Sequence, residues 1–182
     1  MSRAWKFQNP DGLYFISFAT VGWIDVFTRR VYNEIVVDSL NYSIENKGLE
    51  LCAWVLMTNH MHWIARAAEG FAMPDIIRDF KKYTSKQILK AIEENDQESR
   101  KEWMLSIFKN AGSYNSNNST FQFWRQDNKP IELIKPGQIE NTLKYLHNNP
   151  VVAGFVNEPE QYLHSSATDY GGDAGLVKIQ LL

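Results

Sequence analysis

The spacing of hydrophobic and polar positions predicts alternating strands and helices in the first half of the chain. Residues 13–22 and 49–67 are rich in aromatic and β-branched side chains, which favours strands. The polar pair at 58–59 divides the second run into two strands joined by a tight turn. Residues 30–48 and 73–95 carry apolar side chains at helical spacing, so each predicts a helix with one buried face.

The second half of the chain is less regular. Residues 96–120 are first charged and then rich in Asn and Ser, which predicts a flexible insertion. Residues 121–133 have the aromatic content and alternation of another strand, and 135–150 read as a helix that ends at Pro150. The tail from 151 to 182 contains Gly and Ser clusters and is expected to wrap the surface.

This order of elements, β-α-β-β-α-β-α, predicts a single domain over residues 1–182. It is typical of an α+β fold of the ferredoxin-like or RRM-like type, with an antiparallel sheet and helices packed on one face. Such a fold supports many activities, so function has to be sought in particular residues.

Composition excludes several classes of protein. The hydrophobic content of 44% is that of a globular chain, and no apolar run approaches the length of a membrane span. The first residues lack the apolar core of a secretory signal, which leads us to expect a cytoplasmic protein without a membrane partner. A single cysteine, Cys52, excludes an internal disulfide and a multi-cysteine zinc site.

The net charge of −2 is a mild argument against nucleic-acid binding, because such domains more often carry a basic excess. The distribution of charge weakens that argument. A locally basic face is expected on the helix over 73–95, formed by Arg78, Lys81, Lys82, Lys86 and Lys90.

Two histidines open the strand that follows the turn at 58–59. Side chains alternate across a strand, so His60 and His62 lie side by side on one face, at a separation suited to one metal ion. Most such pairs are ordinary half-exposed strand residues. A metal site would need a further protein ligand from elsewhere in the fold and an open position for substrate.

The best candidates for the missing groups lie on the helix over 135–150. Tyr145 and Asn149 are four residues apart and share one helix face, while Leu143 and Leu146 would bury the helix. A phenol beside a divalent cation can attack a phosphodiester, and an amide oxygen is a hard ligand suited to magnesium or manganese. Periodicity alone instead favours Tyr145 as an amphipathic side chain at the helix edge.

The motifs "NHMHW" and "YLHNNPVVAGFV" together resemble the paired signatures of the HUH single-tyrosine transposases, and most closely the REP-associated tyrosine transposases. The similarity extends over "YFISFAT", "CAWVLMTNHMH", "IIRDFKKYTSK", "FWRQDNKPIEL" and "YLHSSATDYGGDAGL". The resemblance implies that His60, His62 and Asn149 are the metal ligands and that Tyr145 is the nucleophile.

The same resemblance implies cleavage and joining of single-stranded DNA beside a hairpin, with Mg2+ or Mn2+ as cofactor. Tyr145 would form a 5′-phosphotyrosine and release a 3′-hydroxyl that can reverse the reaction. Insertion-sequence relatives assemble composite sites in dimers, whereas REP-associated relatives tend to act as monomers, so both a monomer and a homodimer stay open.

Several other residues are candidates for DNA contacts. Lys81, Lys82 and Lys86 are expected to contact phosphates, and Trp124 beside Arg125 to stack on unpaired bases. The alternatives are a solvated helix face for the lysines and a core position for Trp124. Arg3, with Trp5 and Lys6 near the N-terminus, is expected to read the foot of a hairpin.

Two further residues near these motifs have other expected roles. Tyr83 is a rival nucleophile for which packing or base stacking is favoured, and His147 should face away from the site.

Two competing functions remain at this stage. A domesticated protein that binds DNA hairpins without cutting them would have no need of His60, His62, Tyr145 and Asn149 together. An unrelated metallohydrolase would need additional histidine or acidic ligands at metal spacing, which the sequence does not offer.

Overall fold

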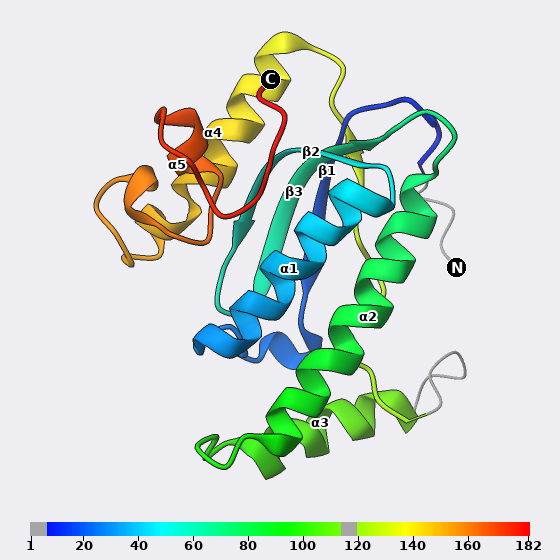
Figure 1. Ribbon diagram of the computed structural model, residues 1–182, viewed down its shortest axis with the longest axis vertical. Helices are drawn as coiled ribbons and strands as arrows, with labels where there is room; N and C mark the ends of the chain where they lie inside the picture. The colour runs from blue at the N-terminus through cyan, green and yellow to red at the C-terminus, as the bar shows by residue number, and fades with distance from the viewer. Residues whose placement is uncertain (1–6, 114–119) are drawn as a thin grey trace.

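The computed structural model of the protein describes residues 7–113 and 120–182 (Figure 1). Its centre is an antiparallel sheet with the strand order β2-β3-β1-β4. The strands are β1 (Tyr14–Ala19), β2 (Leu49–Leu56), β3 (His60–Ala67) and β4 (Ile131–Glu132). This strand order and the observed order of elements along the chain confirm the predicted α+β, ferredoxin-like class.

The two central strands fix the register of the site. Ser17 of β1 lies opposite His62 of β3, and Val55 of β2 lies opposite the same histidine on the other side. Strand β2 carries an irregularity between Leu51 and Ala53, which places Cys52 and Ala53 together on one face of the sheet. His62 is therefore held in the middle of the sheet rather than at an edge.

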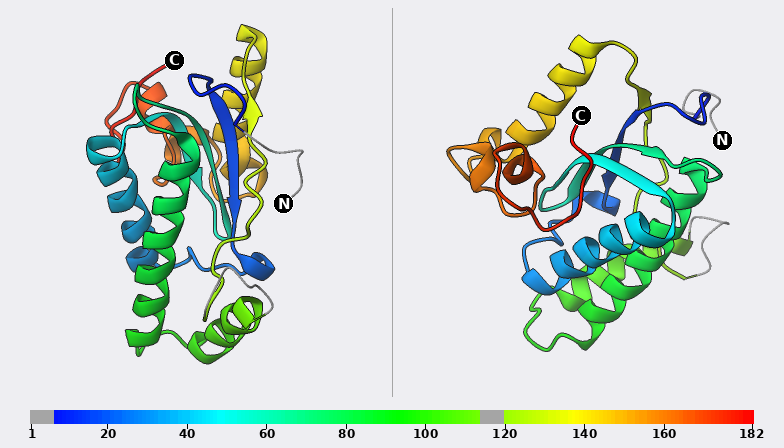
Figure 2. Two further views of the ribbon diagram at one scale, coloured as in Figure 1. Left: turned by 90° about the vertical axis from the view of Figure 1, so that its right-hand side faces the viewer. Right: turned by 45° about the horizontal axis from the view of Figure 1, so that its top comes forward.

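Helices α1 (Arg30–Asn46) and α2 (Met73–Glu94) cover one face of the sheet, as Figure 2 shows on the left side of its first view. Both agree with the helices predicted from periodicity. Their apolar stripes meet alternate side chains of the strands, including the fully buried Phe18, Trp54 and Trp63. This layer is the larger hydrophobic core.

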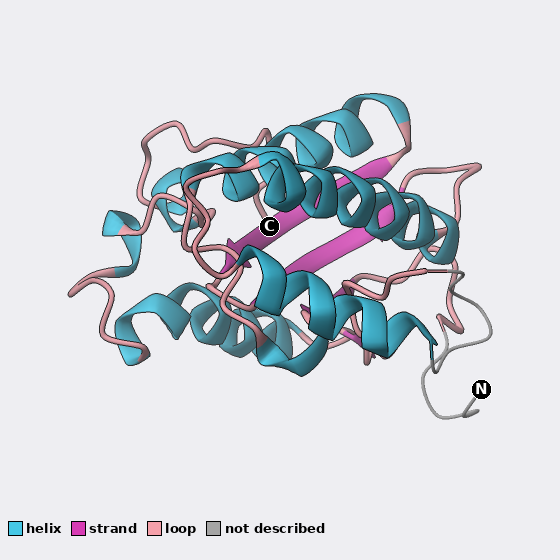
Figure 3. Cartoon of the chain, turned by 90° about the horizontal axis from the view of Figure 1, so that it is seen from below, coloured by secondary structure: helices cyan, strands magenta, loops and turns pink. Residues whose placement is uncertain are grey.

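The opposite face is also covered, which corrects the expectation of helices on one face. Helix α4 (Pro136–Val152) packs there through Leu146 against Val55 and Ile64, in a second and smaller core. The C-terminal segment, with the 3-10 turn η2 (Pro159–Gln161) and the short helix α5 (Ala167–Tyr170), lies beside α4 (Figure 2). In Figure 3 the strands are seen between the helices of the two layers.

A flexible insertion was expected over 96–120, but the structure has helix α3 (Lys101–Ser113) inside that range. Met104, Phe108 and Gly112 follow one another at intervals of four residues and are buried, so a helical stripe anchors the segment to the core. Residues 114–119 lie outside the described residues.

The strand expected over 121–133 is mostly irregular. Trp124 forms a single bridge with Thr20, and only Ile131–Glu132 pair as β4. Lys129 has a positive φ of 41° and is followed by Pro130, which has no N–H to donate, so the chain cannot continue as a regular strand.

Helix α4 continues past Pro150 to Val152, although the sequence predicts that it ends at the proline. Pro150 cannot donate a hydrogen bond to the carbonyl of Leu146 one turn earlier. The Asn149 amide nitrogen approaches that carbonyl at 3.4 Å and also donates to the Tyr145 carbonyl at 2.8 Å. This local compensation explains how the helix tolerates a proline in its last turn.

No helix within residues 7–113 and 120–182 has both the length and the apolar character needed to cross a membrane.

Candidate functional site

His60 and His62 lie side by side at the start of β3, as strand alternation predicts. Their ring centroids are 5.0 Å apart. His62 is 7% exposed and faces the α4 side of the sheet, where the Phe15 ring stacks on it at 5.1 Å. The pair is thus held by packing, with His60 nearer to solvent.

Each histidine uses its Nδ1 atom to contact a neighbour. Ser17 Oγ is 2.8 Å from His62 Nδ1, and Asn59 Oδ1 is 2.7 Å from His60 Nδ1. The Asn59 amide nitrogen donates to Asp25 at 2.9 Å, which orients the amide oxygen toward His60. Because an amide oxygen only accepts, His60 carries its proton on Nδ1 and leaves Nε2 as a lone-pair donor.

Burial keeps both rings neutral. Burial, together with a smaller effect of the neighbouring His60, lowers the pKa of His62 to about 3. Burial also lowers the pKa of His60, against a smaller raising effect of Asp25. Neutral imidazole is the form that a metal ion requires, so at neutral pH both rings have the protonation state that metal binding would need.

Tyr145 lies across from the pair on helix α4. Its ring centroid is 5.8 Å from that of His62 and 6.1 Å from that of Phe15, and the residue is 56% exposed. It also lines an open hollow between α4 and the β1–β4 edge, together with Phe15 and Leu133. The phenol is therefore accessible from solvent while its ring stays beside the histidines.

Asn149 lies one turn after Tyr145 and is half-buried. Its amide nitrogen is used on its own helix, in the hydrogen bonds that accommodate Pro150. The amide oxygen is the atom that could bind a metal ion, and its assignment as third ligand stays a prediction.

The donor set fits a divalent metal ion of mixed nitrogen and oxygen ligation. Two neutral imidazoles supply nitrogen, and an amide or phosphate oxygen supplies the harder ligands that Mg2+ and Mn2+ prefer. Across the described ranges, no group of three or more His, Cys, Asp or Glu side chains is placed to hold a metal ion. A third ligand from the described protein residues would thus have to be of another type, such as Asn149.

His147 faces away from the pair, as predicted from helix geometry. Its Nε2 is 2.8 Å from Ser166 Oγ, and its ring meets Tyr170 edge-on at 5.0 Å. This residue joins α4 to the C-terminal segment.

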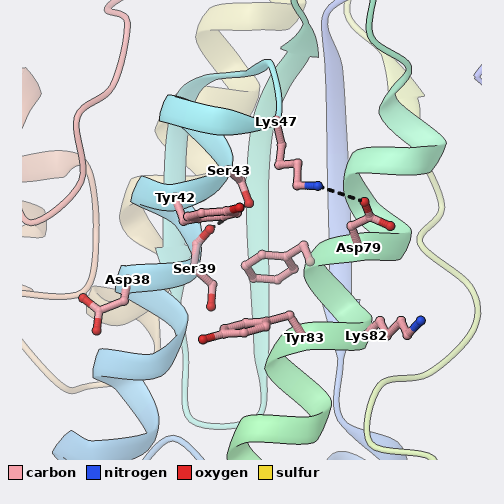
Figure 4. Close-up of a pocket in the computed structure, with 9 residues that line it drawn as sticks. Asp38, Ser39, Tyr42, Ser43, Lys47, Asp79, Lys82 and Tyr83 are labelled. Atoms are coloured by element: carbon pink, nitrogen blue, oxygen red, sulfur yellow. Dashed lines mark hydrogen bonds and ion pairs between the residues drawn. The ribbon is translucent and has the colours of Figure 1, made fainter.

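Tyr83, the rival nucleophile, lies on α2 at the other face of the sheet and is 56% exposed, so it is not packed on the apolar stripe. It lines a groove of about 660 Å³ between α1 and α2 (Figure 4). The same figure has Tyr42 on the opposite wall and Lys47 paired with Asp79 at 3.6 Å.

Two residues expected to contact DNA make contacts inside the protein. Trp124 is 4% exposed, and its indole N–H donates to Thr84 Oγ1 at 2.9 Å, so neither ring face is free for a base. The Lys81 amine donates to the Arg125 carbonyl at 2.6 Å, and burial lowers the pKa of Lys81 to about 8. The stacking role of Trp124 is corrected by its burial, whereas a phosphate contact of Lys81 stays a prediction. Both side chains hold the segment around 125 to helix α2.

The other predicted DNA contacts have different surroundings. The side chains of Lys82, Lys86 and Arg125 are exposed, and their contacts with DNA stay predictions. Arg3 lies outside the described residues, as do the neighbouring Trp5 and Lys6.

Sequence reasoning missed Ser17 and Asn59, the partners of the two histidines. Ser17 was detectable in principle, because it is the one small polar side chain within the otherwise aromatic and aliphatic stretch "YFISFA" of β1.

Residues 18–120 match the protein family described as "Transposase IS200 like". This match covers more than half of the chain, and the protein belongs to the IS200-like transposase family. The matched range contains His60 and His62 and ends before α4. A comparison with curated proteins found no match.

The fold resembles a solved structure described as that of a REP-associated tyrosine transposase bound to a REP hairpin. The sequences are 14% identical, the alignment covers 99% of this chain and 92% of that one, and the TM-score is 0.62. A crystal structure of a candidate transposase from Deinococcus radiodurans R1 is 16% identical, with coverage of 81% and 95% and a TM-score of 0.48.

Proposed function

We propose that the protein is a metal-dependent endonuclease and strand transferase for single-stranded DNA beside hairpins, with Tyr145 as the nucleophile. The observation that carries the proposal is the placement of the Tyr145 ring 5.8 Å from His62 within one chain. A nucleophile from α4 and two neutral histidines from β3 meet there, and family membership independently favours DNA strand transfer.

In the proposed reaction the Tyr145 oxygen attacks a backbone phosphorus atom and the bond to the 3′-oxygen breaks. The phenolic proton is lost, the leaving 3′-oxygen gains a proton, and the 5′-phosphate stays on Tyr145. Attack by a 3′-hydroxyl reverses these changes and seals a strand, so no nucleotide cofactor is needed.

His60, His62 and Asn149 would hold a Mg2+ or Mn2+ ion, which when bound polarises the phosphate. The contribution of the chain is to keep the imidazoles neutral and oriented through Ser17 and Asn59. Exposure of Tyr145 leaves room for the strand to reach it.

The hairpin in the proposed substrate is suggested by the similar solved structure, which is bound to one. That fold covers nearly the whole of this chain, and a hairpin would present its unpaired flank to the exposed Tyr145 side of α4.

The test is to incubate the protein with a hairpin carrying single-stranded flanks and Mn2+, then look for a protein–DNA adduct that survives denaturation. We expect an adduct from the wild type and from Tyr83→Phe, and none from Tyr145→Phe. Tyr83 is a matched control because it has the same 56% exposure on the other face of the sheet.

An adduct from Tyr145→Phe would contradict the assignment of the nucleophile. Tight binding of the hairpin without any adduct from the wild type would identify the alternative function, a hairpin-binding protein that does not cut.

A further inference from the structure

A tryptophan that the reaction does not use stands next to the histidine pair. Trp23 is 52% exposed, and its ring meets His60 edge-on with centroids 5.8 Å apart. A large aromatic side chain that stays in water forgoes the favourable free energy of burying its apolar surface. Its position beside the candidate site therefore calls for an explanation.

The backbone at this position is also unfavourable. Trp23 has a φ of 54° and follows Gly22 with a φ of 68°, so two consecutive residues are left-handed. For a bulky side chain this region is a genuine outlier, and such strain clusters at ligand-binding and catalytic sites. Neither the exposure nor the backbone of Trp23 is explained by packing.

The surrounding hydrogen bonds fix Trp23 relative to His60. The Asn59 side chain accepts from His60 Nδ1 through its oxygen and donates to the Trp23 carbonyl through its nitrogen at 3.3 Å. The backbone N–H of Trp23 donates to the Thr20 carbonyl at 3.1 Å. One amide group therefore couples the tryptophan to the histidine.

Arg125 completes this surface. Its guanidinium carbon lies over the Trp23 ring, 5.5 Å from the centroid. The backbone N–H of Arg125 donates to the Ala19 carbonyl at 2.8 Å, which ties the segment around Arg125 to the end of β1. An exposed indole with a cation beside it is the combination that proteins use for an unpaired base and its phosphate.

We propose that Trp23, with Arg125, is a stacking platform for one unpaired base of the DNA strand bound at the histidine pair. The sequence placed this role on Trp124, and the structure assigns it to Trp23, which reaches Arg125 from another part of the chain. The inference rests on the proposed function, because the platform serves the strand that Tyr145 would cut.

The experiment measures binding apart from cleavage. In a Tyr145→Phe background, fluorescence anisotropy gives the Kd for a labelled hairpin with single-stranded flanks, and for a set of the same oligonucleotide with one abasic position each. Trp23→Ala should weaken binding about 5-fold to 150-fold, the range for loss of one stacked base, and Trp23→Phe should retain most of the affinity.

The abasic set identifies the stacked base. One abasic position should weaken binding to a protein with Trp23 by a similar factor and should have no effect on Trp23→Ala. Tyr42→Ala is the control, because Tyr42 has a similar exposure of 57% on α1, on the other face of the sheet.

Trp23→Gly separates binding from folding. Glycine adopts the positive φ without strain, so this variant should melt at the same or a higher temperature and bind as weakly as Trp23→Ala.

The inference is overturned if Trp23→Ala binds like Tyr42→Ala, or if every abasic penalty persists without Trp23. Adduct formation by the protein that retains Tyr145, together with unchanged binding by Trp23→Ala in the Tyr145→Phe background, removes the platform and leaves the proposed function standing. Binding that depends on Trp23, with no adduct from the protein that retains Tyr145, supports the platform and contradicts the proposed cleavage.

Discussion

Each histidine of the pair has a partner that fixes which nitrogen faces outward. Ser17 contacts His62 at 2.8 Å and Asn59 contacts His60 at 2.7 Å. Such outer partners set the tautomer and the orientation of a metal-binding ring, and they act without touching the metal ion. The chemistry of the pair therefore depends on residues outside the HxH motif.

Ser17→Ala should weaken Mn2+ binding by about 10-fold to 100-fold, because His62 loses the group that orients it. The free energy of unfolding should fall by about 1 kcal/mol through the lost hydrogen bond. Isothermal titration with Mn2+ measures the first effect and urea unfolding the second. Ser106→Ala, at an exposed position on α3, should change neither, and an equal Mn2+ affinity in the two variants would exclude this role of Ser17.

Single residues were predicted well where a backbone period fixes their direction. The proximity of His60 and His62 followed from strand alternation, and the orientation of His147 away from the site followed from helix geometry. Trp124 was predicted wrongly, because it is buried and its partner Thr84 comes from another part of the fold. Local periodicity carries no information on such contacts.

The turns between elements hold the α1–α2 layer to the sheet. Gly48, between α1 and β2, has a φ of 68°, and a β-carbon there would collide with the Phe71 ring. Gly70, in the turn between β3 and α2, has a φ of 83° and open space around it. Phe71 thus packs directly on the backbone at the end of α1.

Gly48→Ala should lower the free energy of unfolding by about 2–4 kcal/mol, from backbone strain together with the displaced Phe71 ring. Gly70→Ala introduces the backbone strain without the collision and should lower the free energy of unfolding by about 1 kcal/mol. Urea unfolding of both variants compares them directly. Equal losses would mean that the Phe71 contact contributes nothing.

Elements were predictable where their apolar spacing is strong, as in α1, α2 and the β2–β3 hairpin. Helix α3 was missed because its charged flank and the Asn- and Ser-rich residues after it outweigh a short stripe of buried residues. The strand over 121–133 was overestimated because aromatic content favours strands, whereas Lys129 and Pro130 interrupt pairing.

Across the whole molecule, all four histidines are at least half-buried and have pKa values below the usual range. Burial is the main cause for His60, His62, His147 and His164. A histidine whose pKa is lower in the folded protein binds its proton more readily when unfolded. Its contribution to stability is therefore complete above about pH 6.5 and is lost as the pH falls.

The metal-free protein should lose stability between pH 6.5 and pH 4.5, before the loss linked to Glu98 begins, since the pKa of Glu98 is lowered from 4.5 to about 2. His147 alone, with a pKa of about 4, accounts for a loss of about 2–3 kcal/mol by pH 4.5. Urea unfolding of the wild type and His147→Gln at pH 7 and pH 4.5 isolates this share. An identical decline in both proteins would refute it.

The order of the site residues along the chain has a consequence for protein synthesis. Ser17 and the histidine pair leave the ribosome early, whereas Tyr145 follows much later on α4, and α4 is held in place by Ser166 through His147. Under the proposed function, a nascent chain or one that terminates before Tyr145 would carry the histidine pair without a nucleophile. Incomplete products could therefore not become covalently trapped on the cell's DNA.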